Sequence, residues 1–465
     1  MTRPRNTAIL ASACIALSVL GPALWAQEAA GTAPTAAPGA AQDGSAVGGI
    51  VQSGAVPAPA AEPAPPTAAD LAKRYGTIPE QGGLYLQAGF YRLVDALGFA
   101  VTLPEWLVVL VALLVVCLIV FGFINVFALF AVWLERKVSA HIQCRLGPME
   151  VGPHGLLQTI ADGIKLTAKE DIIPRLADRP LYILAPILVF TGVLIRFVPL
   201  PFGQHLVASD LDLGLFFVAA VGTVEVIGVI MAGWSSNNKW SLFGTIRTAT
   251  QMVSYEIPIG FAFVAVIACA GSFSLQDIVN QQRGWFWNWY VLVNPFLTIL
   301  SIVYLTASLA ECKRAPFDLP EAESELVSGF HTEYTGMRFG LFFLSEYAAM
   351  YLVSAVAVVI FFGGWWSGIR PLDDIGMSPG SPPAAAIAGF LLKAAVFVTK
   401  AVVLVFVQVW VRWTLPRVRL DQMMHLCWKV LLPISLVCLV GSTLWQMASG
   451  GAGLYGIPAL LGLGS

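Results

Sequence analysis

The chain has 465 residues, of which 57% are hydrophobic and only 12% are charged, and its formal net charge is −2. A soluble domain carries roughly twice that share of charged residues, so the composition excludes an ordinary soluble protein. We expect a lipid bilayer, and not nucleic acid, around this chain.

The first 82 residues differ from the rest. Arg3 and Arg5 precede an apolar stretch in the layout of a secretory signal peptide, which we predict for residues 1–26. An additional uncleaved span is the alternative. Residues 27–82 are rich in Ala, Pro and Gly and cannot bury enough apolar surface to fold, so we predict a flexible extension. Residues 83–465 are predicted to form a helical membrane domain.

Long apolar runs recur through this domain. A helix needs about 20 apolar residues to cross the hydrocarbon core. The sequence therefore predicts an all-α, polytopic membrane protein with about eight transmembrane helices and additional amphipathic interfacial helices. The predicted spans are residues 106–134, 181–199, 211–233, 252–270, 291–310, 339–363, 384–411 and 430–447.

The distribution of Lys and Arg predicts the orientation of the spans. Of the 26 Lys and Arg residues, 16 fall in four alternate connecting segments: 135–180, 234–251, 311–338 and 412–429. The opposite segments between the spans hold Arg196, Arg283 and Arg370. We therefore place the four segments rich in Lys and Arg on the inner side of the membrane and the N-terminus on the outer side. The predicted export signal independently requires an outer N-terminus.

The first inner segment begins with Glu135 and Arg136 at the end of a span. Two Gly-Pro steps then force turns. A helical pattern follows, with apolar residues such as Ile160 on one face and polar residues such as Asp162 on another. This pattern fits an amphipathic helix in the membrane plane, and an ordinary surface helix is the alternative.

Three carboxylates fall inside predicted spans: Glu225, Glu256 and Glu346. A charged side chain in the bilayer is costly unless it is paired, protonated or exposed to water. We therefore interpret these acids as functional, with structural hydrogen bonding as the alternative. Lys400, in the seventh predicted span, is a candidate counter-charge.

The segment 311–333 is unusually acidic for a connection between two apolar runs. Six carboxylates there face only two cations, Lys313 and Arg314. Acids beside a low-dielectric slab tend to raise their pKa or acquire partners. Glu321 and Glu325 are four residues apart, so their charges would repel and a shared proton is expected. The segment predicts a site that handles protons or a polar head group, and a solvated acidic loop is the alternative.

Cofactor motifs are absent from the sequence. The seven Cys residues form no Cys-x-x-Cys pair, and the five His residues offer no paired ligands. No Gly-rich dinucleotide fingerprint follows a strand. We predict that the chain binds no metal, flavin or other redox cofactor by itself.

Five separated strings occur in order between about residue 100 and residue 445: ERKVSAHIQCRLGP, GLLQTIADGIKL, GWSSNNKWSLFG with QMVSYEIP, RAPFDLPEAESELVSGFHTEYTGMRF, and WVRWTLPRVRLDQMMHLCWKVLLP. Together they resemble the H subunit of bacterial NADH:quinone oxidoreductase (respiratory complex I), the counterpart of the mitochondrial first membrane subunit. Residues 1–82 lie outside the resemblance.

The resemblance implies a helical subunit at the junction of the membrane arm with the peripheral arm. Its inner loops would build part of the quinone-binding chamber, and its acids would begin a proton-coupling pathway. Quinone would be the substrate, with NADH, FMN and iron–sulfur clusters in partner subunits. The expected partners are the quinone-site and iron–sulfur subunits of the peripheral arm and the small membrane subunits, in the bacterial inner membrane with a periplasmic N-terminus.

The resemblance also assigns roles to residues. Those expected in proton coupling are Glu256, Glu311, Asp318, Glu321, Glu323 and Glu325, with Glu225 added from its sequence context. Those expected near the quinone chamber are Glu135, Arg136, Arg145, Asp162 and Arg314.

The sequence departs from the family pattern near the chamber mouth. Cys144 stands where Asp is common, and Met149-Glu150 where Asn-Arg often occurs. The common Glu-Thr-Asn-Arg becomes Glu311-Cys312-Lys313-Arg314. These changes alter the local charge near the expected chamber mouth.

The resulting hypothesis is that quinone reduction shifts the pKa values of the loop acids, at about 1.4 kcal/mol per unit. Buried polar residues would pass this free energy to antiporter-like subunits. Two alternatives remain open. A membrane anchor of an energy-converting hydrogenase is disfavoured by the complete RAPFDLPEAESELVSGF string. A stand-alone secondary transporter is disfavoured because no repeated halves are evident.

Overall fold

The computed structural model describes residues 105–204, 206–320, 323–374 and 383–448. The signal peptide, the extension and the periplasmic N-terminus predicted from the sequence lie outside these residues. Within them the regular elements are helices, with one isolated β-bridge between Gly203 and Leu206. The predicted all-α class is confirmed.

Six helices of the described ranges are long and apolar enough to cross a membrane. They are α4 (Glu105–Ile142), α7 (Gly214–Ser235), α8 (Lys239–Ala270), α13 (Gly336–Phe361), α15 (Pro383–Thr414) and the continuous run of α16 (Leu420–His425), the π-helical turn η4 (Leu426–Leu431) and α17 (Leu432–Ala448). Two shorter apolar helices, α6 (Arg179–Ile195) and α11 (Pro295–Glu311), occupy the second and fifth predicted spans. The polytopic class is confirmed, and a total of eight crossings stays a prediction.

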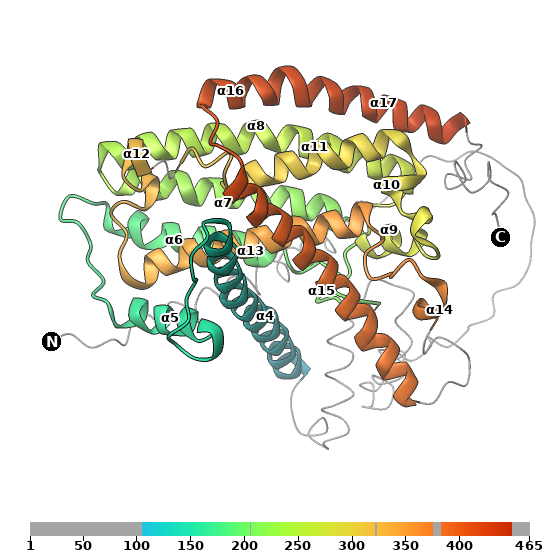
Figure 1. Cartoon of the computed structure of the whole chain (residues 1–465), viewed down its shortest axis with the longest axis horizontal. Helices are drawn as coiled ribbons and strands as arrows, with labels where there is room; N and C mark the ends of the chain where they lie inside the picture. Colours follow the sequence, from blue (N-terminus) through green and yellow to red (C-terminus); the bar gives the residue numbers. More distant parts are fainter. Residues whose placement is uncertain (1–104, 205, 321–322, 375–382, 449–465) are drawn as a thin grey trace, which may run out of the picture.

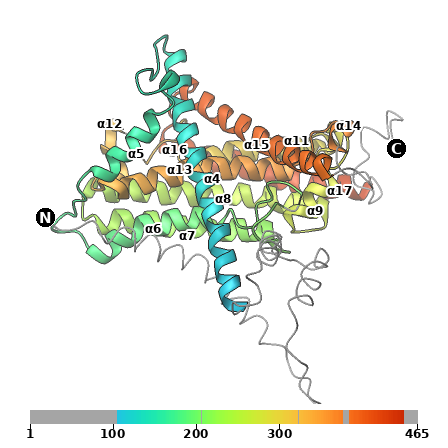
Figure 2. The same cartoon turned by 90° about the horizontal axis from the view of Figure 1, so that it is seen from below.

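The helices form a bundle in which α6, α7, α8, α11 and α13 run side by side, while α4 and α15 cross it obliquely (Figures 1 and 2). α17 packs along α8 and α11. Short helices fill the connections: η1 (Pro153–Gly155), α5 (Gln158–Ala168), α9 (Leu275–Gln281), η2 (Phe286–Asn288), α10 (Tyr290–Val293), α12 (Glu323–Leu326), η3 (Gly329–His331) and α14 (Arg370–Asp373).

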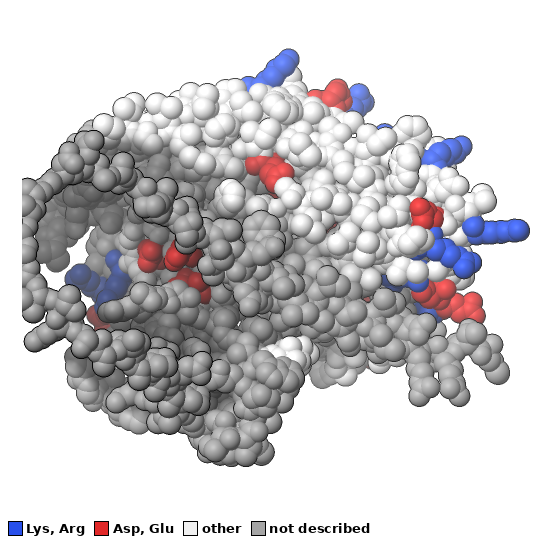
Figure 3. All heavy atoms as spheres, turned by 180° about the vertical axis from the view of Figure 1, so that it is seen from behind, with Lys and Arg blue, Asp and Glu red and all other residues white. Residues whose placement is uncertain are grey.

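The four segments predicted to share the inner side lie together at one end of the bundle, which we call the loop end. α5 and α12 lie there, whereas α9, α10 and α14 lie at the opposite end (Figure 1). Direct contacts join the segments: the amide of Ile172 donates to Thr335 Oγ1 at 3.2 Å, and that of Val418 donates to the Pro316 carbonyl at 3.0 Å. Charged side chains gather at the loop end, on the right of Figure 3, and the surface between the ends carries few.

The fourth span begins earlier than predicted. The sequence placed its start at residue 252, but α8 begins at Lys239, so only residues 236–238 connect it to α7. Asn238 starts the helix because its side chain accepts from the Trp240 amide at 2.9 Å. The polar residues that made this stretch look like a loop, such as Thr248 and Gln251, face the protein interior and are fully buried.

α13 is the central helix of the bundle. Of its most apolar 18 residues 83% are buried, against 22–56% for the other five long helices. It packs against α4, α6, α11 and α15. A charged side chain on α13 is therefore enclosed by protein and needs a partner from a neighbouring helix or loop.

The close approach of α7 to α8 depends on Gly233. A Cβ at this position would lie 1.6 Å from Thr245 Oγ1 and 2.6 Å from Thr245 Cβ. Because overpacking a core costs about 1–3 kcal/mol, Gly233→Ala should lower the free energy of unfolding by that amount, measured by denaturant titration in mild detergent. Gly122→Ala on α4 is the matched control, since an added Cβ there meets nothing within 4 Å. Equal effects of the two substitutions would contradict the close approach.

Candidate functional site

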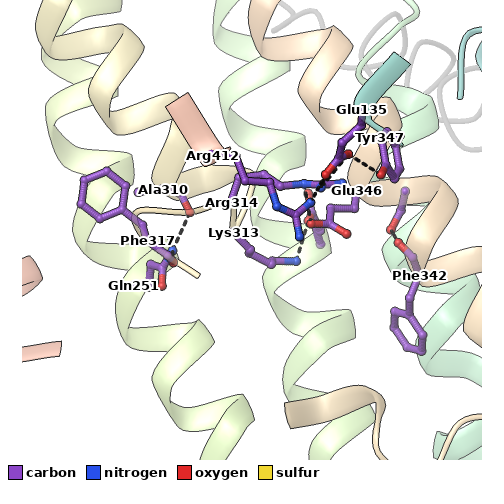
Figure 4. A network of polar contacts seen from close by, with 12 residues as sticks. Glu135, Gln251, Ala310, Lys313, Arg314, Phe317, Phe342, Glu346, Tyr347 and Arg412 are labelled. Atoms are coloured by element: carbon purple, nitrogen blue, oxygen red, sulfur yellow. Dashed lines mark hydrogen bonds and ion pairs between the residues drawn. The ribbon is translucent and has the colours of Figure 1, made fainter. Parts of the chain in front are cut away.

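The first group of buried charges, which we name the Arg314 cluster, comprises Glu135, Arg314, Glu346, Tyr347 and Arg412 (Figure 4). Arg314 Nη1 lies 3.1 Å from Glu135 Oε2, and Arg314 Nε lies 2.9 Å from Glu346 Oε1. The Tyr347 hydroxyl donates to Glu135 Oε2 at 2.5 Å, and Arg412 pairs with Glu135 Oε1. Two arginines and two carboxylates thus balance in charge.

The Arg314 cluster joins four separate parts of the chain. Glu135 comes from α4, Glu346 and Tyr347 from α13, Arg412 from α15, and Arg314 from the loop after α11. Arg314 is only 2% exposed and also lies over the Tyr347 ring, 4.4 Å from its centroid. A charge buried to this extent is tolerated only when it is paired, so the ion pairs fix how α4, α13 and α15 meet.

The second group, the Glu225 cluster, comprises Arg196, Glu225, Glu311 and Lys313. Lys313 Nζ lies 3.0 Å from Glu225 Oε1, and Arg196 Nη2 lies 2.7 Å from Glu311 Oε1. Arg196 Nη1 is more distant from Glu225 Oε2, at 3.9 Å. Lys313 and Arg314 are consecutive residues with partners in different clusters, so the loop backbone connects the two groups.

A cavity of about 90 Å³ lies beside the Glu225 cluster. Its polar lining is Arg196, Glu256 and Glu311, and its apolar walls include Met252 and Phe263. The volume is large enough to hold water. The Nε of buried Arg196 makes no hydrogen bond to any side chain or backbone group that the structure describes. Half-buried Glu256 therefore places a carboxylate at the wall of a mainly apolar cavity.

The predicted chamber residues are only partly brought together. Glu135 and Arg314 meet in the Arg314 cluster, whereas Arg136 Nη1 pairs with Asp162 Oδ2 at 2.6 Å and thereby holds α5 against α4. Burial acts to raise the pKa of Asp162, but the hydrogen bonds and charges of Arg136 and Lys165 lower it below its usual value. The carboxylate therefore stays ionised at neutral pH. Arg145 is exposed and lies outside both clusters.

The acids of segment 311–333 do not form one group. Glu325 pairs with Arg247 at 2.6 Å and with Arg417 at 2.7 Å. The hydrogen bond from Arg247, opposed by slight desolvation and aided by the charge of Arg417, lowers the pKa of Glu325. Asp318 is half-buried within the loop.

Two further acids of this segment have no described side chain. Glu323 begins α12, and Glu321 lies outside the described residues. The proton sharing expected between Glu321 and Glu325 stays a prediction.

Two interpretations of cations were wrong. Lys400 is not the counter-charge of an intramembrane acid, because its Nζ donates to the carbonyls of Phe362 at 2.7 Å and Trp366 at 2.6 Å, where it caps the end of α13. Arg196, counted with the outer segments, is 5% exposed and pairs with Glu311. Charge counting along a sequence cannot distinguish a buried arginine from an exposed one.

Other members of the clusters were missed or left without a role. Arg412 carried no signal beyond its place just after a predicted span, and Tyr347 carried none. Glu346 was noted only as an acid inside a predicted span. Among the residues that the structure describes, no group of three or more His, Cys, Asp or Glu could hold a metal ion.

These features define an all-α, polytopic membrane protein whose apolar bundle encloses two charge-balanced clusters beside a small cavity. Residues 114–443 match the model of the NADH dehydrogenase family. This match covers more than half of the chain, and the chain therefore belongs to this family.

Similar curated proteins share one name, that of the H subunit of NADH-quinone oxidoreductase. The protein from Anaeromyxobacter dehalogenans is 46% identical over 357 residues, which are 76% of this chain and 86% of that protein. That from Chlorobaculum parvum is 46% identical over 336 residues, which are 72% of this chain and 92% of its own length. That from Chlorobaculum tepidum is 47% identical over 336 residues, which are again 72% of this chain and 92% of its own length.

Proposed function

We propose that the chain is the membrane subunit of a proton-pumping NADH:quinone oxidoreductase that forms part of the quinone-binding chamber and the start of the proton-coupling pathway. The observation that carries this proposal is the pair of buried, charge-balanced clusters joined by Lys313 and Arg314 beside the cavity of Glu256. The names of the relatives favour this function over a hydrogenase anchor and a stand-alone transporter.

The quinone-binding part of the proposal is supported by the region around α5. The Arg136–Asp162 pair offers polar groups at the loop end. Close to it on the same helix, Ile160 and Ile164 are 44% and 66% exposed. A quinone has a polar head and an apolar tail, so it matches a surface where a charged pair adjoins exposed aliphatic side chains.

The proton-coupling part begins with the charge that quinone reduction adds near the loop end. The Arg314 cluster would respond first, because Arg314 is the cation shared by Glu135 and Glu346. A shift of the Lys313–Arg314 backbone would then alter the Glu225 cluster and the protonation of Glu256 at the cavity. Because consecutive residues belong to the two clusters, this backbone element gives the change a physical route from one cluster to the other.

The chain would transfer no electrons itself. Electrons would arrive from the iron–sulfur subunit, with NADH and FMN bound by other subunits of the peripheral arm. The small membrane subunits would be neighbours of this chain, and the protonation energy would pass along buried polar residues to the antiporter-like subunits. The assembly would lie in the bacterial inner membrane with the loop end on the cytoplasmic side and the N-terminus in the periplasm, as the Lys and Arg distribution indicates.

The chamber assignment is tested with Asp162→Asn in the assembled enzyme. The substitution keeps the side-chain volume but removes the charged acceptor of Arg136 and Lys165. We expect quinone binding to weaken by about 1 kcal/mol, which should raise the KM for quinone about fivefold with a smaller change in kcat. Asp374→Asn is the matched control, since its exposed pair with Arg283 lies at the opposite end. An unchanged KM for quinone in the Asp162→Asn enzyme would contradict the assignment of α5 to the quinone-binding chamber.

A further inference from the structure

Lys313 is a buried cation in an unusual backbone conformation. Its side chain is among the buried charged groups, at 7% exposure, and its φ is +55°. Residues other than Gly, Asn and Asp seldom adopt this left-handed conformation. The conformation directs consecutive side chains to different places, so that Lys313 reaches Glu225 on α7 while Arg314 reaches Glu135 on α4.

Lys313 is the cation closest to Glu225 among the ion pairs described. Its Nζ lies 3.0 Å from Glu225 Oε1, whereas Arg196 approaches the other oxygen only to 3.9 Å and makes its short contact, at 2.7 Å, with Glu311. The two carboxylates of the cluster thus have one near cation each. Phe330 contributes its ring face to Lys313, 5.4 Å from Nζ.

The neighbouring charged groups cannot replace Lys313. On α13, Glu346 is matched by Arg314, and on α8, Glu256 adds a further acid to the cavity. His331 in η3 is close enough to feel the Lys313 charge, but its burial, together with that charge, lowers its pKa to about 3. This histidine is therefore neutral at physiological pH.

Tyr304 on α11, beside Arg196 and Glu311, is an uncharged neighbour at physiological pH. With Arg196, Lys313, Glu225 and Glu311 all ionised, the Glu225 cluster is neutral. Without Lys313 it would hold one excess negative charge in a buried place.

We propose that Lys313 is a positioning residue that keeps Glu225 ionised as a fixed counter-charge, so that the proton moving through the cavity is carried by Glu256, which lines the cavity without an ion pair among those described. The inference rests on the proposed function for the moving proton and its carrier. The charge balance of the cluster follows from the contacts alone. It also changes the role of Glu225 from a proton carrier to a group that holds the loop cation in place.

The test measures the pH profile of quinone reduction in the assembled enzyme. Lys313→Asn removes the charge with a residue that accepts a positive φ. The cluster must then bind an extra proton to stay neutral, so activity should persist at acidic pH and fall about tenfold per pH unit on the alkaline side. Lys313→Arg keeps the cation and should keep the parental profile. Lys429→Asn, at an exposed lysine, is the matched control.

The decisive variant is the double substitution Lys313→Asn with Glu225→Gln, which removes one charge of each sign. It should regain most of the alkaline activity lost in Lys313→Asn. If the Lys313→Asn enzyme fails to assemble, adding Glu225→Gln should restore assembly, because the double variant has no excess buried charge. A parental pH profile in Lys313→Asn, or a double variant no better than the single one, overturns the inference. Failure of the proposed function would appear separately, as normal proton pumping in a Glu256→Gln enzyme.

Discussion

Arg314→Met should lower the free energy of unfolding by about 3–5 kcal/mol, because it leaves Glu135 and Glu346 buried without their shared cation. Methionine fills much of the same space, so the effect reports the lost charge and not a cavity. Denaturant titration of the subunit in mild detergent measures it. Adding Glu346→Leu should recover part of the loss, since an apolar replacement of both partners removes the unpaired charge.

Arg283→Met provides the comparison for Arg314→Met. Arg283 pairs with Asp374 at 3.3 Å, but both side chains are more than half exposed, at 52% and 57%. An exposed pair contributes about 0–1 kcal/mol, so this substitution should have little effect. If the two arginine variants were equally stable, the buried cluster would not be what holds α4 and α13 together.

Glu256→Gln should reduce proton pumping at least about tenfold, an increase of ~1.4 kcal/mol or more in the barrier. Glutamine keeps the size and hydrogen-bonding capacity of the side chain but carries no exchangeable acidic proton. Quinone reduction should slow as well, because the two processes are coupled in the proposed mechanism. Both rates are measured on the enzyme in proteoliposomes. Asp212→Asn, at an exposed carboxylate, is the control, and intact pumping in Glu256→Gln would defeat the proton-coupling proposal.

Hydropathy alone located the apolar helices, because a membrane helix must satisfy its backbone groups internally and expose apolar side chains. It misplaced the start of α8 because Thr248 and Gln251 face protein and not lipid. Gln251 Nε2 donates to the carbonyls of Ala310 and Phe317, both at 2.8 Å, a contact between segments distant in sequence. A hydropathy profile carries no information about such partners.

The charged residues were found more readily than their pairings. Burial cost marked Glu225, Glu256 and Glu346 as special, but the cation of Glu346 is Arg314 and not Lys400. Ion pairing is a property of helices brought together in space, and spacing along one helix does not determine it. The clusters could therefore be predicted as a set of acids but not as a network.

Two departures from the family pattern acquire a physical meaning in the fold. Cys144 and Lys313 both adopt positive φ values, 54° and 55°, at positions where the family commonly has Asp and Asn. Asp and Asn adopt this conformation more readily than most residues, so the residues expected from the resemblance fit the backbone described here. At Lys313 the change supplies the buried cation of Glu225.

The central claim is that a carboxylate at the cavity changes protonation when quinone is reduced. Redox-triggered infrared difference spectroscopy of the assembled enzyme tests it most directly, because a protonated carboxyl group has its own C=O stretching band. We expect a carboxyl band that changes on quinone reduction, is lost in Glu256→Gln and persists in Asp212→Asn. Identical difference spectra from the parent enzyme and Glu256→Gln would contradict the claim.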